Sequence, residues 1–381
     1  MDFSLSDTQL SVKASIVEFA RNELNRDLIN NDKKAHFPRD SWEKCAAMGL
    51  MALPIPSKYG GADGDLLTTI ISVEALGYGC CDSGLVHALV TQVLCGLQIC
   101  AFGNERQKEN YLPKICTGQQ IYAQAMTEPD AGSDVLAMRT RADKSAHGYV
   151  LNGTKMFISN GPIADMVLVF AVTNQKKNKV GSISCFIVEK ETEGLERCKA
   201  LDKMGLRTLQ NGELVFDDCL VVHDNLLGKE GQGLFMFNEA LQVERILLFA
   251  CHLGAMERIL ETSVKYAKQR SQFGRTIEKF QSISNKIADM KVNIELGKLI
   301  LYKAAWLKDQ GERANLETSI AKLFVSESLK KACLDAVQIH GGYGYMTEFG
   351  IERDLRNSIA STIYSGTSEI QRNIISSLTG L

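Results

Sequence analysis

One acidic side chain falls on what would otherwise be an apolar face of a helix. Phe237, Leu241, Glu244, Leu248 and Cys251 are spaced by four, three, four and three residues, which places them on one stripe of an α-helix. A charge on such a stripe is costly to bury unless it is paired or functional, and desolvation raises the pKa of a carboxyl toward neutrality. Glu244 is therefore a candidate general base.

A buried ion pair is the alternative interpretation of Glu244. The adjacent cation, Arg245, lies about 100° further around the helix, which makes it a poor partner. On the residues alone, base and ion pair stay equally open.

A glycine-rich segment near the C-terminus could let a planar ligand approach the backbone. QIHGGYGYMTEFGIERDLRN, residues 338–357, holds three glycines within four residues. The segment follows a helical pattern and not a strand, so it does not fit a Rossmann dinucleotide site. A helix C-cap and turn is the alternative.

Two shorter segments place hydroxyl groups in turns. AMTEPDAGSD, residues 125–134, carries Thr127 and Ser133, and FISNG, residues 157–161, combines an aromatic ring, a hydroxyl and a glycine at a strand end. These groups could hydrogen-bond a heterocycle, although ordinary loops have the same composition.

Two arginines flank a glycine in RSQFGRTIEKFQSI, residues 270–283. The guanidinium groups of Arg270 and Arg275 match the oxygen geometry of a pyrophosphate. An exposed turn between helices is the alternative.

The elements that must position these groups change character twice along the chain. Helical periodicity extends to about residue 118, and alternating β-branched and aromatic residues with Gly turns follow from about 120 to 226. No proline follows Pro162, which permits long helices in the last part. Those helices are predicted at residues 232–268, 277–310 and 313–340.

Composition and charge exclude several classes of protein. The chain has 381 residues, 45% apolar and 23% charged, with a formal net charge of −2, so neither a nucleic-acid partner nor disorder is expected. The N-terminus has no signal-peptide pattern, and no run of 18 apolar residues predicts a membrane span. The 11 cysteines lack paired CxxC motifs, so we expect no metal site and a cytoplasmic, reducing location.

Together these segments resemble the acyl-CoA dehydrogenase family of FAD flavoproteins. AMTEPDAGSD is similar to the first family signature, and the loops IPSKYGGADG and FGNERQKENYLPKICTGQ also resemble family segments. Every spaced position of the second signature is matched: Gln338, Gly341, Gly342, Gly344, Tyr345, Glu348, Arg353 and Asn357. The resemblance implies an α+β fold with an N-terminal all-α domain (1–119), a middle β-barrel-like domain (120–228) and a C-terminal four-helix-bundle domain (229–381).

The resemblance assigns one set of residues to the flavin itself. It implies that Thr127 and Ser133 lie by the flavin or the thioester, and that Ser159 touches the flavin ring. Phe157 stands where many relatives have Trp beside the ring. The departure keeps an aromatic group but changes how exposed the ring would be.

A second set is implied to hold the rest of FAD across a subunit boundary. Arg270 and Phe273 would hold the diphosphate region, and Gln338 and Gly342 would reach FAD from a neighbouring subunit. This arrangement implies a homotetramer, built as a dimer of dimers.

The family reaction removes the α-proton of a thioester and passes a β-hydride to flavin N5, which requires a positioned carboxylate. In most relatives that carboxylate precedes the Gly of a YxGT loop, where this chain has Ser365, whose hydroxyl cannot be the base. Relatives similar to isovaleryl-CoA dehydrogenases carry the base within an LxxER pattern. LQVER, residues 241–245, matches it, so the resemblance favours Glu244 as the base.

The loop TIYSGTSEIQR then keeps its other expected roles. Thr367 and Glu369 would contact the adenine-side half of FAD. The predicted substrate pocket combines loop and helix residues: Tyr364, Ser365, Leu241 and Arg245.

Within the family, the chain most resembles the prolyl-carrier-protein dehydrogenases and oxidases of natural-product pathways, such as those of anatoxin-type alkaloids. That resemblance implies a proline thioester on the phosphopantetheine arm of an acyl carrier protein, oxidised to a 1-pyrroline-5-carboxyl thioester. Gln242 stands where relatives with this helix-borne base often have Asp, so contacts near the thioester would differ.

Three other functions stay open. One is a short branched-chain (isovaleryl-type) acyl-CoA dehydrogenase that uses an electron-transfer flavoprotein, another a flavin monooxygenase or nitroalkane-type oxidase, and the third a non-catalytic homologue. The electron acceptor is not defined by the sequence. His340, inside the glycine-rich segment, is a candidate for a charge that activates oxygen.

Overall fold

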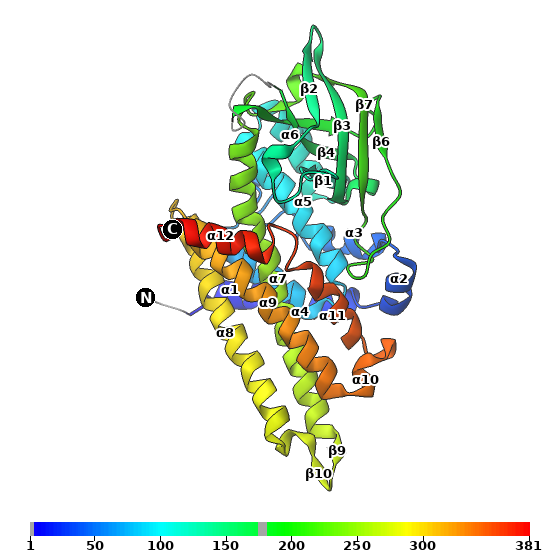
Figure 1. The fold of residues 1–381 in the computed structure, drawn as a ribbon, viewed down its shortest axis with the longest axis vertical. Coiled ribbons are helices and arrows are strands. Elements are labelled where there is room, and N and C mark those ends of the chain that lie inside the picture. Colours follow the sequence, from blue (N-terminus) through cyan, green and yellow to red (C-terminus); the bar gives the residue numbers. More distant parts are fainter. Residues whose placement is uncertain (1–3, 174–180) are drawn as a thin grey trace.

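The computed structural model describes residues 4–173 and 181–381. Figure 1 shows an elongated molecule in which most of the strands gather at one end and long helices extend to the other, where a small two-stranded hairpin lies. The order along the chain is helical, then β, then helical, which confirms the predicted α+β class. The domain boundaries at 119/120 and 228/229 stay a prediction.

The N-terminal part is a set of helices around a largely apolar core. Ser6 and Asp7 are both of the residue types that cap helices, and Ser6 caps the first helix through a capping box with Gln9. The helices are α1 (Asp7–Glu23), α2 (Leu28–Lys34), α3 (Arg39–Ala47), α4 (Leu66–Gly79), α5 (Ser83–Phe102) and α6 (Glu105–Cys116).

The middle part is an eight-stranded sheet in the order β6-β7-β3-β2-β4-β5-β8, with β1 added in parallel to β4. Its strands are β1 (Tyr122–Ala125), β2 (Arg141–Ser145), β3 (Gly148–Ser159), β4 (Met166–Val172), β5 (Ile183–Glu189), β6 (Leu195–Arg197), β7 (Asn211–Val222) and β8 (Leu226–Leu227).

Three long helices dominate the C-terminal part, close to the predicted segments. These are α7 (Gly233–Gln269), α8 (Gln281–Asp309) and α9 (Asn315–His340). A small hairpin and three short helices complete it: β9 (Ser271–Gln272), β10 (Arg275–Thr276), α10 (Gly342–Tyr345), α11 (Ile351–Ala360) and α12 (Ser368–Leu378).

Helix α5 has the length and composition of a membrane-spanning helix, but 72% of its most apolar stretch is buried within the protein. Such burial is typical of a core helix, and α5 packs against α6, α7 and β1.

Helices α4 and α7 cross with their backbones in contact. A Cβ atom on Gly77 of α4 would lie 2.1 Å from the carbonyl oxygen of Cys251, and one on Gly254 of α7 would lie 2.0 Å from that of Glu74. Only glycine permits this approach from either side. Beside the crossing, the fully buried Glu74 accepts hydrogen bonds from Lys13 of α1 and Tyr302 of α8.

A buried ion pair fastens the loop after β1 to strand β3. Lys155 is fully buried, and its Nζ donates to Glu128 Oε1 (2.9 Å) and to the carbonyl of Met126 (3.0 Å). Glu128 also accepts from the backbone N–H groups of Arg139 and Thr140, further along the same loop. Burial alone would raise the pKa of Glu128, but the Lys155 ammonium overcomes this and leaves that pKa below its usual value.

We expect Gly77→Ala to lower the free energy of unfolding by about 1–3 kcal/mol, because the added methyl group meets backbone that cannot turn aside. Gly96→Ala in α5 is the matched control, since its Cβ would meet only the ends of isoleucine side chains. Thermal denaturation of the two variants measures the difference. Equal stability would show that the crossing is not constrained as described.

We expect Lys155→Met to lower the free energy of unfolding by about 3–5 kcal/mol, because it leaves the Glu128 carboxylate buried and unpaired. The control is Lys190→Met, which breaks a solvent-exposed ion pair with Asp165 and should cost less than about 1 kcal/mol. Chemical denaturation followed by circular dichroism compares the two. A loss as small as the control's would contradict the structural role of the pair.

Candidate functional site

Glu244 of α7 and Ser365 of the loop before α12 meet across 121 residues of sequence. The Ser365 hydroxyl donates a hydrogen bond of 2.5 Å to Glu244 Oε1. Arg245 does not take the Glu244 carboxylate as its hydrogen-bond acceptor, and its Nε donates to the carbonyl of Ser365 at 3.0 Å. The predicted base Glu244 and the predicted pocket residues Arg245 and Ser365 therefore lie together.

The pKa of the Glu244 carboxyl is raised above its ordinary value. Burial is the main cause, and the Ser365 hydrogen bond and the Arg245 guanidinium act against it. A raised pKa suits a group that must accept a proton near neutral pH.

The Tyr364 side chain contacts two histidine side chains. It shares a 2.5 Å hydrogen bond with His252 Nε2, and its ring meets the edge of His87 at 5.0 Å. Burial lowers the pKa of His87 to about 4 and that of His252 to about 3, so both rings are neutral at pH 7. Leu241, one helical turn before Arg245, packs on the apolar cluster that contains Met126 and Phe237.

Strand β3 and the loop after β1 present the predicted flavin contacts side by side. The N–H of Met156 donates to the carbonyl of Thr127, which places Thr127 beside strand β3 next to Met156, the residue before Phe157. Phe157 is 63% exposed and has a left-handed backbone (φ 60°), and Asn211 donates to its carbonyl. Ser133 is exposed further along the loop.

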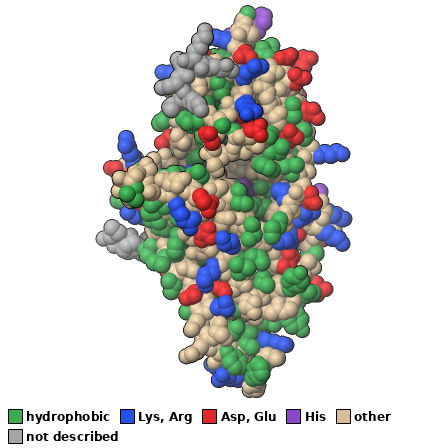
Figure 2. Space-filling view, viewed as in Figure 1, with side chains coloured by type: hydrophobic (Ala, Val, Ile, Leu, Met, Phe, Trp, Pro, Cys, Tyr) green, Lys and Arg blue, Asp and Glu red, His purple; other side chains and the backbone are tan. Residues whose placement is uncertain are grey.

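Strained backbone marks three of the predicted site residues. Phe157, Phe273 and Ser365 all have positive φ angles, which non-glycine residues rarely adopt. Such strain gathers at ligand-binding and catalytic positions, where the surrounding structure maintains it. Figure 2 shows a hollow in the surface at the junction of the sheet and the helical part of the molecule.

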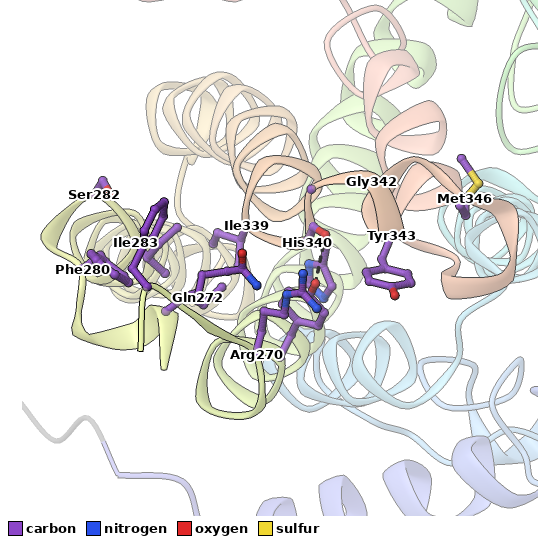
Figure 3. A pocket seen from close by; sticks show the side chains of 14 residues that line it. Arg270, Gln272, Phe280, Ser282, Ile283, Ile339, His340, Gly342, Tyr343 and Met346 are labelled. Carbon is purple, nitrogen blue, oxygen red and sulfur yellow. Dashed lines mark hydrogen bonds between the residues drawn. The ribbon is translucent and has the colours of Figure 1, made fainter. Parts of the chain in front are cut away.

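A second group of predicted residues lies at the far end of α7. A cavity of about 810 Å³ is lined there by Arg270, Phe273, His340 and Gly342, among others. Figure 3 shows the Arg270 side chain pointing toward His340, with Tyr343 beyond it. Phe273 is 94% exposed at the tip of the β9–β10 hairpin, and Gln338 is exposed near the end of α9.

His340 is held by protein contacts at the wall of this cavity. Its Nδ1 is 2.8 Å from the carbonyl oxygen of Ala336, and its ring stacks on Tyr266 at 4.3 Å between centroids. Burial lowers its pKa, which favours the neutral ring.

The two groups are too far apart to serve opposite ends of one site in one protomer. Glu244 and Arg270 are separated by 26 residues of continuous helix, or about 39 Å. Thr367, which caps α12 through a bond from Ile370 N, and the exposed Glu369 belong to the Glu244 end.

The residues at both ends fit the parts of a flavin dinucleotide. The Glu244 end offers an exposed aromatic ring with hydroxyl groups beside it, and the other end offers an exposed guanidinium beside glycines. A Cβ atom added to Gly341 or Gly342 would meet nothing within 4 Å, so a ligand can approach the backbone there. In the described ranges, no group of three or more His, Cys, Asp or Glu side chains could hold a metal ion.

Several residues around the site carry no signal in the sequence. Gln371 and Lys322 are fully buried near Ser365 and Arg245, and Lys155 and Glu128 hold the flavin-side loop. Glu128 and Gln371 lie within the quoted segments AMTEPDAGSD and TIYSGTSEIQR, but the structural roles of these buried polar residues are recognised only once their partners are brought together.

Comparison with known protein families matches three domain models along the chain. They describe the acyl-CoA dehydrogenase N-terminal domain (residues 6–119), middle domain (123–219) and C-terminal domain (231–378).

Full-length relatives are similar over nearly the whole chain. An L-prolyl-[peptidyl-carrier protein] dehydrogenase from Pseudomonas fluorescens is 41% identical over 98% of each chain. One from Serratia sp. is 39% identical over 100% of this chain and 99% of its own. A mitochondrial isovaleryl-CoA dehydrogenase from Oryza sativa is 37% identical over 97% of this chain and 90% of its own.

Solved structures agree with the fold in detail. The prolyl acyl carrier protein oxidase AnaB superposes with a TM-score of 0.97 at 44% identity, covering 99% of this chain and 100% of its own. PigA with FAD and proline gives a TM-score of 0.97 at 38% identity over 100% of both chains. The chain therefore belongs to the acyl-CoA dehydrogenase family.

Proposed function

We propose that this protein oxidises a prolyl thioester held on the phosphopantetheine arm of an acyl carrier protein, with FAD as the electron acceptor in the site. The enzyme is a flavin oxidoreductase that acts on thioesters. The observation that carries the finer proposal is the Glu244 carboxylate, desolvated on an apolar helix face and hydrogen-bonded to the residue at the usual base position. The prolyl substrate is supported by the names of the relatives in the comparison.

In this proposal Glu244 takes the α-proton of the thioester as the C–H electron pair moves into a new α,β double bond. When bound, FAD accepts the hydride that leaves the β-carbon, so two electrons and two hydrogens leave the substrate in total. Rearrangement of the double bond gives the 1-pyrroline-5-carboxyl thioester. The small, neutral Ser365 leaves room for a compact ring beside the base.

The remaining predicted site residues would bind FAD and orient it. Phe157, Thr127 and Ser159 would lie along the flavin ring, and Thr367 and Glu369 near the adenine-side half. The second group, which is Arg270, Phe273, Gln338 and Gly342, would hold FAD of a neighbouring copy, because about 39 Å of helix separates Arg270 from Glu244. This separation supports a site shared between copies of the chain, and we propose that the copies form a homotetramer in the cytoplasm.

A short branched-chain acyl-CoA dehydrogenase is the second candidate. The LQVER pattern and the isovaleryl-CoA dehydrogenase relative favour it. It would use the same base and cofactor and pass electrons to an electron-transfer flavoprotein. Because burial lowers the pKa of His340, its ring carries little positive charge to assist a reaction with oxygen. The oxygen-activating role of His340 stays a prediction.

We expect Glu244→Gln to abolish substrate-dependent bleaching of the flavin, because the amide cannot accept the α-proton. Loss should be at least about 10²–10⁴-fold, the usual contribution of a general base. Stopped-flow absorbance under anaerobic conditions measures the rate, and the flavin-to-protein absorbance ratio must match the parent's. Glu239→Gln, on the same helix, is the control. Retained turnover in Glu244→Gln would falsify the assignment of the base.

We expect flavin bleaching with a prolyl carrier protein and not with isovaleryl-CoA. Admitting air after reduction then separates the acceptors, because rapid reoxidation indicates an oxidase and slow reoxidation indicates a dehydrogenase that needs a protein partner. The reverse substrate preference would establish the branched-chain alternative. The same carrier protein without proline is the control.

A further inference from the structure

We infer that Ser365 is a positioning residue, whose hydroxyl orients the Glu244 carboxylate and favours its charged form, and that Gln371 acts through Ser365 by holding its backbone. This inference rests on the proposed role of Glu244 as the base.

The hydroxyl of Ser365 can act on Glu244 only while its backbone stays in an unusual conformation. Ser365 has φ 56°, in the left-handed region that non-glycine residues avoid. Its carbonyl oxygen accepts two hydrogen bonds, from Arg245 Nε at 3.0 Å and from Gln371 Nε2 at 3.1 Å. These two donors come from α7 and α12, so they hold the loop from both sides.

The amide nitrogen of Gln371 donates both of its hydrogen bonds to this loop. Its side chain is fully buried, and Nε2 donates to the carbonyls of Ser365 and Gly366, both at 3.1 Å. A Cβ atom on Gly366 would lie 2.7 Å from the same nitrogen, which shows how closely the loop packs on it. A buried amide with this geometry fixes the direction in which the neighbouring Ser365 side chain points.

Few other groups can set the charge of Glu244. Cys95 of α5, Arg245 of α7 and Tyr364 of the loop interact with it electrostatically, and Lys322 of α9 faces Arg245. Burial raises the pKa of the Cys95 thiol and of the Tyr364 hydroxyl, which keeps both neutral. The Ser365 hydroxyl and the Arg245 guanidinium are thus the groups that favour the carboxylate.

The test uses two variants of the FAD-loaded full-length protein. Ser365→Ala keeps the Cβ atom and removes the hydroxyl, whereas Ser365→Gly also relieves the backbone strain. In both, the midpoint of the pH dependence of anaerobic flavin reduction should rise by about one pH unit, the value of one hydrogen bond to a charged group. Well above that midpoint the rate should return toward the parent's.

A second measurement reads the base directly. The infrared difference spectrum between the substrate-free parent and Glu244→Gln isolates the absorption band of the Glu244 carboxyl group. Recorded over a range of pH, this band follows the protonation of Glu244. The band's titration should shift upward in Ser365→Ala by the same amount as the kinetic midpoint. This readout does not depend on turnover.

Gln371→Met tests whether Gln371 acts by holding the backbone of Ser365, because methionine has a similar volume but no amide N–H group to donate. It should raise the same midpoint in the parent and add no further shift in the Ser365→Ala background, since the hydroxyl through which it acts is then absent. A further shift in the double variant would overturn the assignment of Gln371.

The outcomes separate this inference from the proposed function. If Glu244→Gln is inactive but both Ser365 variants keep the parent's pH midpoint, Ser365 is not a positioning residue and the base assignment stands. A rate lowered equally at every pH would likewise overturn the inference, because it indicates only a structural role. If Glu244→Gln reduces flavin normally with the prolyl carrier protein, the assignment of Glu244 as the base fails, and the inference about Ser365 that rests on it fails too.

Discussion

The backbone contact between α4 and α7 constrains everything that the site requires. Gly77 and Gly254 each lie against a backbone carbonyl of the other helix, so the crossing of α4 and α7 leaves no room for a larger side chain at either position. That one helix carries Glu244 near its beginning and delivers Arg270 at its end. The position of the base relative to the loop before α12 is therefore set by packing in the core.

The carboxylates of Glu128 and Glu244 differ in the partners that surround them, and this difference sets their protonation. Glu128 has a buried ammonium and two backbone N–H groups as partners, which lower its pKa and favour its charged form. Glu244 has a neutral hydroxyl, and the nearest guanidinium is engaged by a carbonyl, so burial prevails and its pKa rises. The difference in partners leaves one carboxylate fixed and the other free to exchange a proton.

Local patterns in the sequence were sufficient to predict the long helices and the strand region, and to single out one candidate residue of the site. The long helices, the strand region and the Ser6 cap follow from periodicity and capping rules. Glu244 could be singled out because a charge interrupts an apolar stripe. The hydrogen bond from Ser365 could not, since it joins residues 121 positions apart, and neither could Gln371, whose partners are backbone atoms. Arg245 was correctly judged a poor partner for Glu244, but its actual acceptor required the folded loop.

Helix α12 contributes Gln371 to the candidate site and has few buried residues of its own. Among its eleven residues, only Ser368 and Gln371 are buried, and Ser368 is tied to Glu327 of α9. Local opening of this terminal helix would withdraw Gln371 and release Ser365 while the core helices stay folded. Activity would then be lost on heating before the protein melts, and protection of the α12 amides from hydrogen exchange would report the intact site more faithfully than the overall melting temperature.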